Sequence, residues 1–253
     1  MKIAICLHGQ PRNYEIGFSH LQREFISKYD TDVFAHTWWS LEQVGQYYYT
    51  GPLVKKDYKI EANFPEKINN LYHFKDVIYE ASKNFNSEKQ YNVPWPDKHD
   101  NTIDSHKSRF YSFKNSLQLC ENYEKDNHIE YDWIILTRFE IAIYTMPLLS
   151  TLNKDNIYVD NFHSGRPYIF NDNLWLFGNY KYFFKNLYDD FDKNYEMMLK
   201  KQESPFYHLI QNIDELSNCN IINGEQFIAF YLLFNGLLDK VIKHAGISYN
   251  LIR

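Results

Sequence analysis

Residues 1–39 constrain the fold more than any other part of the chain, because two strand-like runs enclose a helix-like segment. The run "KIAICL" at 2–7 stops at a Gly/Pro loop, as a buried parallel strand does where it enters a ligand-facing turn. Apolar residues recur at near-helical spacing over 17–29, and "TDVFAHTWW" at 31–39 has the pattern of a second strand. This β-loop-α-β opening predicts an α/β protein with a mostly parallel sheet.

Most of the remaining chain continues this alternation of helix-like and strand-like segments. The segments are helical at 106–126, 180–200 and 224–238, and strand-like at 131–144, 156–160 and 171–179. There is no internal repeat, so we expect a single domain over residues 1–253 in which helices flank the sheet.

Between residues 40 and 105 the periodicity fades, and only 75–84 has the pattern of a short helix. An irregular stretch of this length inside a compact domain is often a lid or a substrate-binding insertion. A partly disordered loop has the same sequence pattern, so both interpretations stay open at this point.

Charge and cysteine content narrow the partners and the location. The formal net charge is −5, so the surface as a whole does not favour binding of a polyanion. Nucleic acid is therefore disfavoured as a partner. Three cysteines without CxxC spacing argue against a disulfide framework and a structural zinc site, and they favour a reducing, cytoplasmic location. No run reaches the roughly 18 apolar residues of a membrane span, and no signal-peptide pattern is present, so any membrane contact is expected to be peripheral.

The run "YDWIILTRFEIAIY" at 131–144 carries two opposite charges inside an otherwise apolar stretch. Arg138 and Glu140 are two residues apart, so in a single strand both side chains would lie on the same face. Ligands of α/β sheets bind at the carboxyl ends of strands, where a carboxylate can hold a divalent cation and an arginine can bind phosphate oxygens. A structural ion pair is the alternative, with comparable weight.

The order of several motifs resembles that of bacterial and viral glycosyltransferases of lipopolysaccharide and capsule synthesis, the WavE-like group, which have a GT-A-like fold. The motifs are "LHGQPRNY", "TDVFAHTWW", "RFYSFKNSLQLCENYE", "YDWIILTRFEI", "DNLWLFG" and "NGEQFIAFYLL". The resemblance covers nearly the whole chain except 40–105, and it rests on order and context because no single motif is specific. It implies an enzyme that transfers a sugar from a nucleoside-diphosphate sugar to a hydroxyl of a glycan or glycolipid acceptor, with Mn²⁺ or Mg²⁺.

The resemblance places the donor site on several of these motifs. Glu140 stands where the group has the final Asp of an Arg-x-Asp motif, which implies a metal ligand, although the longer Glu is equally compatible with a weaker or absent metal requirement. Arg138 is implied to face the sugar-nucleotide phosphates. The loop that contains Gly9, Gln10 and Arg12 is implied to lie against the nucleotide. Further candidates for nucleotide contacts, each with a purely structural alternative, are His36, Tyr111 and Lys114.

Three more residues are candidates for the chemistry. Asp172 would accept the proton of the acceptor hydroxyl if the reaction inverts configuration; otherwise it would cap a loop as an Asx turn. Glu225 would contact substrate from the first turn of a helix, or only complement the helix dipole. His244 lies where some GT-A enzymes place a final metal ligand, although a lone histidine is more often structural.

Three other functions compete with this interpretation. Glu140 in place of Asp keeps open a catalytically inactive carbohydrate- or nucleotide-binding protein of the same fold. A viral DNA-modifying glycosyltransferase is disfavoured by the acidic net charge. A phosphoryl- or nucleotidyl-transferring protein ranks lower still, because the chain has no GxxxxGK[ST] loop.

Overall fold

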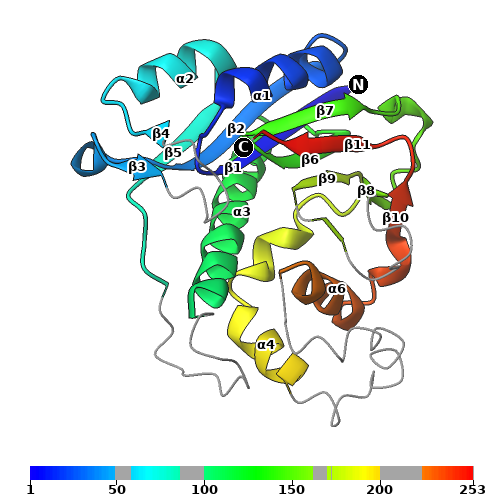
Figure 1. The fold of residues 1–253 in the computed structure, drawn as a ribbon. Helices are drawn as coiled ribbons and strands as arrows, with labels where there is room; N and C mark the ends of the chain where they lie inside the picture. The colour runs from blue at the N-terminus through cyan, green and yellow to red at the C-terminus, as the bar shows by residue number, and fades with distance from the viewer. Residues whose placement is uncertain (49–57, 86–99, 162–169, 172, 200–223, 253) are drawn as a thin grey trace.

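A seven-stranded sheet forms the centre of the molecule in the computed structural model, which describes residues 1–48, 58–85, 100–161, 170–171, 173–199 and 224–252 (Figure 1). The strands, in spatial order, are β10 (Val241–His244), β8 (Ile157–Asp160), β9 (Leu174–Phe177), β6 (Trp133–Arg138), β1 (Lys2–Gly9), β2 (Asp30–Trp38) and β5 (Asp76–Glu80).

Within the described residues, every strand of this sheet except β9 runs in one direction. β1 is parallel to both neighbours, β2 and β6, and the pairs β2–β5 and β8–β10 are also parallel. β9 is antiparallel to β6 and to β8, so β6 and β8 again run the same way. The predicted α/β class with a mostly parallel, helix-flanked sheet is therefore confirmed.

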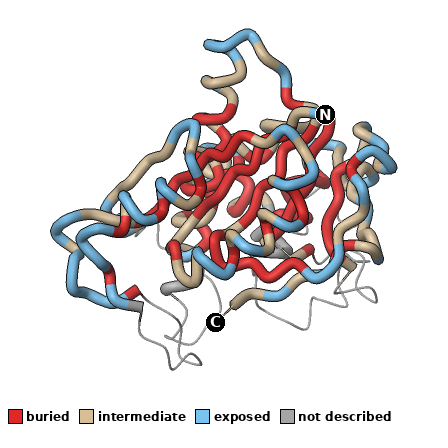
Figure 2. Tube along the Cα trace, turned by 90° about the horizontal axis from the view of Figure 1, so that it is seen from above, coloured by how far each residue is buried: buried red, intermediate tan, exposed pale blue. Residues whose placement is uncertain are grey.

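Strand alternation divides the core between the two faces of the sheet. Cys6 and Leu136 pack in a cluster with helix α3, whereas Ile5 and Ile135 pack in a second cluster on the opposite face. The buried segments run through the middle of the molecule, with exposed loops around them (Figure 2). The helices of the first face are α3 (Asp100–Asp126), α4 (Phe191–Leu199) and α6 (Gly224–Phe234), and those of the second are α1 (Tyr14–Leu21) and α2 (Phe64–Tyr72) (Figure 1).

The apolar stretch 131–144, expected to be one strand, consists of two strands in different sheets, so that expectation was wrong. β6 ends at Arg138, and a turn at 139–140 follows. The next strand pairs antiparallel with the end of the chain in a separate two-stranded sheet made of β7 (Ile141–Thr145) and β11 (Ser248–Leu251). The structure therefore places Arg138 and Glu140 on either side of a turn instead of on one strand face.

The turn is held from two sides. Helix α1 lies so close to it that a Cβ atom on Gly17 would be 1.7 Å from the carbonyl oxygen of Phe139. The backbone N–H of Ile252 donates to the carbonyl of Glu140 at 2.9 Å. Glycine at position 17 and the strand at the chain end together fix where Glu140 lies.

The region 40–105 contains more regular structure than its sequence predicts. Helix α2 begins next to Pro65, which suits a first helical turn because proline lacks an N–H. The helix expected at 75–84 was wrong, because 76–80 is strand β5, which extends the sheet beside β2. This edge strand is at most partly buried, so its sequence lacks the clear apolar alternation by which strands are identified. A short pair, β3 (Tyr47–Tyr48) and β4 (Tyr58–Lys59), also falls here.

The segment 180–200, predicted as one amphipathic helix, is interrupted. A 3₁₀-helix at Phe183–Leu187 precedes α4, and both direct aromatic side chains into the core of the α3 face. Phe184, Leu187, Phe191 and Tyr195 are buried, whereas the expected continuity of the helix was wrong. Among the described helices, none combines the length and the apolar character that crossing a membrane requires.

Candidate functional site

The strand directions bring several polar residues to one edge of the sheet, which we call the carboxyl edge. All strands of the sheet except β9 end there, and β9 begins there. This is where ligands bind in open α/β sheets, because loops diverge from the strand ends. The polar or charged residues that end strands or follow them at this edge are Arg12, Glu80, Arg138, Glu140, Asp160 and His244.

Glu140 lies between two arginines at this edge. Arg12 contacts both carboxylate oxygens, with Nε 2.6 Å from Oε2 and Nη2 2.7 Å from Oε1, and Arg138 Nη2 also donates to Oε1. The Glu140 side chain is 1% exposed, whereas Arg12 and Arg138 are 10% and 15% exposed. A nearly buried carboxylate thus orients two guanidinium groups whose edges reach the surface.

The loop that carries Arg12 is fixed at its start. Gly9 ends β1 with a φ of 93°, a left-handed conformation that favours glycine. Its N–H donates to the Oγ of Ser112 on helix α3 at 2.9 Å. The backbone conformation is what favours glycine at position 9, because a Cβ atom there would meet nothing within 4 Å. Gln10 and Arg12 follow this turn at the carboxyl edge.

His36 connects this turn to the neighbouring strand β5. Its Nε2 lies 3.1 Å from Glu80 Oε2 and its Nδ1 lies 2.7 Å from Ser112 Oγ. Burial lowers the pKa of His36 even though Glu80 opposes this, so the imidazole is neutral near pH 7. Because a carboxylate only accepts hydrogen bonds, Nε2 carries the proton and Nδ1 accepts from the Ser112 hydroxyl.

Tyr111 and Lys114 differ in their contact partners. Tyr111 stacks on Trp38 with ring centroids 5.8 Å apart, and its hydroxyl lies 3.3 Å from Glu80 Oε1, so it belongs to the carboxyl edge. Lys114 binds the carboxylate of Asp189 at 2.6 and 2.7 Å. Its ammonium group is thus paired with the exposed carboxylate of Asp189.

His8 is a buried polar residue of this edge that the sequence analysis did not select. It is 1% exposed, its ring meets the edge of Phe113 at 4.3 Å, and its Nε2 has no hydrogen-bond partner among the described residues. Burial, with the positive charges of Arg138 and Arg109, holds the pKa of His8 well below its usual range. The signal was present: alternation from the buried Cys6 puts position 8 on the α3 face.

The remaining predicted residues have weaker support or none. His244 accepts a hydrogen bond from the N–H of Gly246 at 3.0 Å and packs against Tyr158. Its register with Asp160 puts it on the face of the sheet opposite to Arg138. The backbone of Glu225 lies in the first turn of α6, and Asp172 lies outside the described residues.

The residues at Glu140 do not fit a divalent cation as arranged here. Both oxygens of the carboxylate bind guanidinium groups, and Mg²⁺ or Mn²⁺ needs free oxygen ligands. His244, the other predicted ligand, lies on the opposite face. In the part of the chain that the structure describes, no group of three or more His, Cys, Asp or Glu residues is placed to hold a metal.

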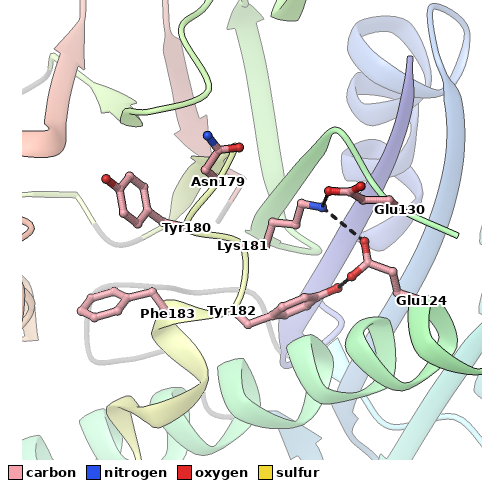
Figure 3. Close-up of a pocket in the computed structure, with 7 residues that line it drawn as sticks. All are labelled: Glu124, Glu130, Asn179, Tyr180, Lys181, Tyr182 and Phe183. Atoms are coloured by element: carbon pink, nitrogen blue, oxygen red, sulfur yellow. Dashed lines mark hydrogen bonds and ion pairs between the residues drawn. The ribbon is translucent and has the colours of Figure 1, made fainter. Parts of the chain in front are cut away.

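A separate pocket of about 390 Å³ lies at the opposite, amino end of β6. Lys181 bridges Glu124 and Glu130 at 3.3 and 3.2 Å across it, and the hydroxyl of Tyr182 donates to Glu124 at 2.8 Å (Figure 3). One ammonium group thus pairs with two carboxylates, which leaves one net negative charge among the lining residues. The residues that line it are Glu124, Glu130, Asn179, Tyr180, Lys181, Tyr182 and Phe183.

The fold and the carboxyl edge define an α/β protein with a charged site that contains arginine. No known protein family and no curated protein matches the sequence. Among solved structures, the chain is similar to a glycosyltransferase involved in glycosylation of the major capsid of PBCV-1, with TM-score 0.39, 11% identity, and coverage of 96% of this chain and 82% of that one. It is also similar to the apo form of the glycosyltransferase GlyE of Streptococcus pneumoniae TIGR4, with TM-score 0.36 and 8% identity. That match covers 96% of this chain and 44% of the GlyE chain.

Proposed function

We propose that the chain is a glycosyltransferase that takes a nucleoside-diphosphate sugar and transfers the sugar to a hydroxyl of a glycan or glycolipid acceptor. The observation that carries this proposal is the convergence of Arg12 and Arg138 on Glu140 at the carboxyl edge. These residues come from the two motifs that resemble the donor-binding motifs of the WavE-like glycosyltransferases. Identities of 11% and below leave the function to be argued from the residues of this chain.

The arrangement suits a reaction whose leaving group is a diphosphate. Negative charge grows on the diphosphate as the glycosidic bond breaks, and a fixed guanidinium group stabilises that charge. Arg138 is held in place by Glu140, so little reorganisation is required during the reaction. Asp172 and Glu225 stay the candidates for the group that accepts the proton of the acceptor hydroxyl.

A second candidate function is a nucleotide- or carbohydrate-binding protein without turnover. The observation that favours it is the engagement of Glu140, since both oxygens of its carboxylate are bound by arginines. This candidate would bind its ligand at the same proposed donor site as the glycosyltransferase. It differs from the glycosyltransferase only in that no sugar is transferred.

Release of nucleotide from a panel of sugar donors tests the proposal. The purified chain is incubated with UDP-, GDP-, dTDP- and CMP-linked sugars, with and without a mixture of glycan acceptors, and the free nucleotide is quantified. We expect release from one nucleotide class, and a loss of about 100-fold or more in kcat/KM for Arg138→Ala. Arg23→Ala is the control, because Arg23 is 52% exposed and pairs with Glu24 away from the carboxyl edge. Binding of a nucleotide without any turnover would support the second candidate instead.

A further inference from the structure

The cluster of Arg12, Arg138 and Glu140 has its own charge balance. Within the cluster, two guanidinium groups share one carboxylate. A divalent cation bound to Glu140 would supply positive charge beside the same carboxylate. The two arginines therefore provide what a metal provides in electrostatic terms, while occupying the carboxylate that would bind it.

Helix α3 adds a further cation to the same face of the sheet. Arg109 lies one turn before Phe113, so both side chains project from one side of the helix. Phe113 contacts His8, and His8 is the register partner of Arg138 on the neighbouring strand. The positive charges of Arg109 and Arg138 both act on the imidazole of His8. Arg138, His8 and Arg109 thus come from β6, β1 and α3 to one place.

His8 supplies the second, independent observation that a ligand belongs here. A buried polar nitrogen without a partner costs free energy, and native proteins retain few of them. His8 is 1% exposed, and its Nε2 has no hydrogen-bond partner among the described residues, so it is such a nitrogen. Its neutral form can donate one hydrogen bond, and the atoms that accept such bonds best beside two arginines are anionic oxygens.

We propose that Arg138, Arg109 and His8 bind the diphosphate of the sugar donor without a divalent cation, and that Glu140 orients Arg12 and Arg138 instead of ligating a metal. This inference rests on the proposed function, because it names how the donor of that reaction is held. The arginines then carry the charge of the leaving group, and His8 gives one directed hydrogen bond to it.

Calorimetric titration of UDP, GDP and dTDP into the full chain, in EDTA and separately in Mn²⁺, tests this inference. We expect one nucleotide to bind in EDTA, with a Kd that Mn²⁺ changes by less than about threefold. The affinity should fall as salt is raised, because charged groups carry the binding. A Kd that Mn²⁺ tightens tenfold or more would overturn the metal-free site and leave the glycosyltransferase proposal standing. Failure of every nucleotide to bind in either buffer would overturn both.

Two variants separate the role of His8 from a general loss of folding. His8→Leu removes the donor, whereas His8→Asn keeps a donor of similar reach. In EDTA we expect His8→Leu to weaken nucleotide binding at least tenfold and His8→Asn to recover part of that loss, with Arg23→Ala unchanged. Equal affinity of His8→Leu and the unmodified chain, with thermal melting that shows both folded, would contradict the assignment of His8.

Discussion

At the scale of single residues, Glu140 has the most demanding surroundings in the candidate site. Its carboxylate is nearly buried and is bound by the guanidinium groups of Arg12 and Arg138. Removing one partner of a buried ion pair leaves the other charges uncompensated, and this costs more than the pair itself contributes.

Glu140→Gln is therefore expected to lower the free energy of unfolding by about 3 to 5 kcal/mol, since both arginines then lose the carboxylate that they share. Urea denaturation measures the change. Glu61→Gln is the matched control, because Glu61 pairs with Lys67 on the surface, where solvent screens the interaction and such pairs contribute little. A Glu140→Gln variant as stable as the control would show that water or rearranged side chains solvate the arginines.

The sequence revealed the members of this cluster but not the contact between them. Arg138 and Glu140 were identifiable as charges inside an apolar stretch, and Arg12 as the end of a Gly/Pro loop. Arg12 and Glu140 are 128 positions apart, and their contact depends on the order of strands in the sheet. Spacing along one segment cannot predict that order.

At the scale of elements, helix α1 and the turn at 139–140 form one packing unit. The close approach of the helix to the carbonyl of Phe139 leaves no room for a side chain at Gly17. The same turn carries Glu140, so this packing also sets the position of the arginine cluster.

Gly17→Ala should destabilise the fold by about 1 to 3 kcal/mol, because an added methyl group must push the helix away from the turn. The better helix propensity of alanine offsets less than about 1 kcal/mol of this. Thermal and urea unfolding measure the change. Ile16→Ala, on the exposed side of the same helix, should change stability by less than about 0.5 kcal/mol. A stabilised Gly17→Ala protein would contradict the packing described here.

The elements that sequence predicts well are those whose side chains are buried in a regular pattern. β1 and β2 have nearly continuous burial, and their apolar runs locate them to within two residues. The start of β6 is located equally well, whereas its end at Arg138 was missed because the apolar run continues into β7. β5 and β10 lie at the two edges of the sheet with mostly intermediate exposure, and neither was predicted. A short edge strand gives little periodic signal, because only part of its surface meets the core.

At the scale of the whole molecule, three buried histidines link stability to pH. Burial lowers the pKa of His8 and His36, with the charges of nearby Arg138 and Arg109 adding to the effect on His8, and burial with Arg109 lowers the pKa of His106 from 6.5 to about 3. In the unfolded chain these rings take up protons as pH falls below about 6.5, whereas the native state resists protonation. The contribution of these histidines to the free energy of unfolding is therefore fully present above about pH 6.5, and it is lost progressively as the pH falls below that value.

We expect the free energy of unfolding to fall between pH 6.5 and about 4.5 by at most ~1.4 kcal/mol per pH unit for each such histidine. Carboxylates with lowered pKa values, such as Asp32 and Glu80, add their loss at lower pH. Urea denaturation across pH 4.5 to 8 measures the slope. His106→Asn should make it shallower, and His128→Asn, at an exposed site, should leave it unchanged. A free energy of unfolding that stays constant from pH 7 to 5 would contradict the prediction.

The reversed strand β9 has a consequence for how this scaffold can diversify. Because β8 and β9 are antiparallel, the chain leaves β8 and returns to β9 at the same carboxyl edge, beside Arg138. The register of β8 and β9 is set by their pairing with each other and with β6, so a change in the length of the connection between them need not shift it. A lineage, or a protein engineer, can thus vary the surface next to the cluster of Arg12, Arg138 and Glu140 while the strands that hold this cluster stay unchanged.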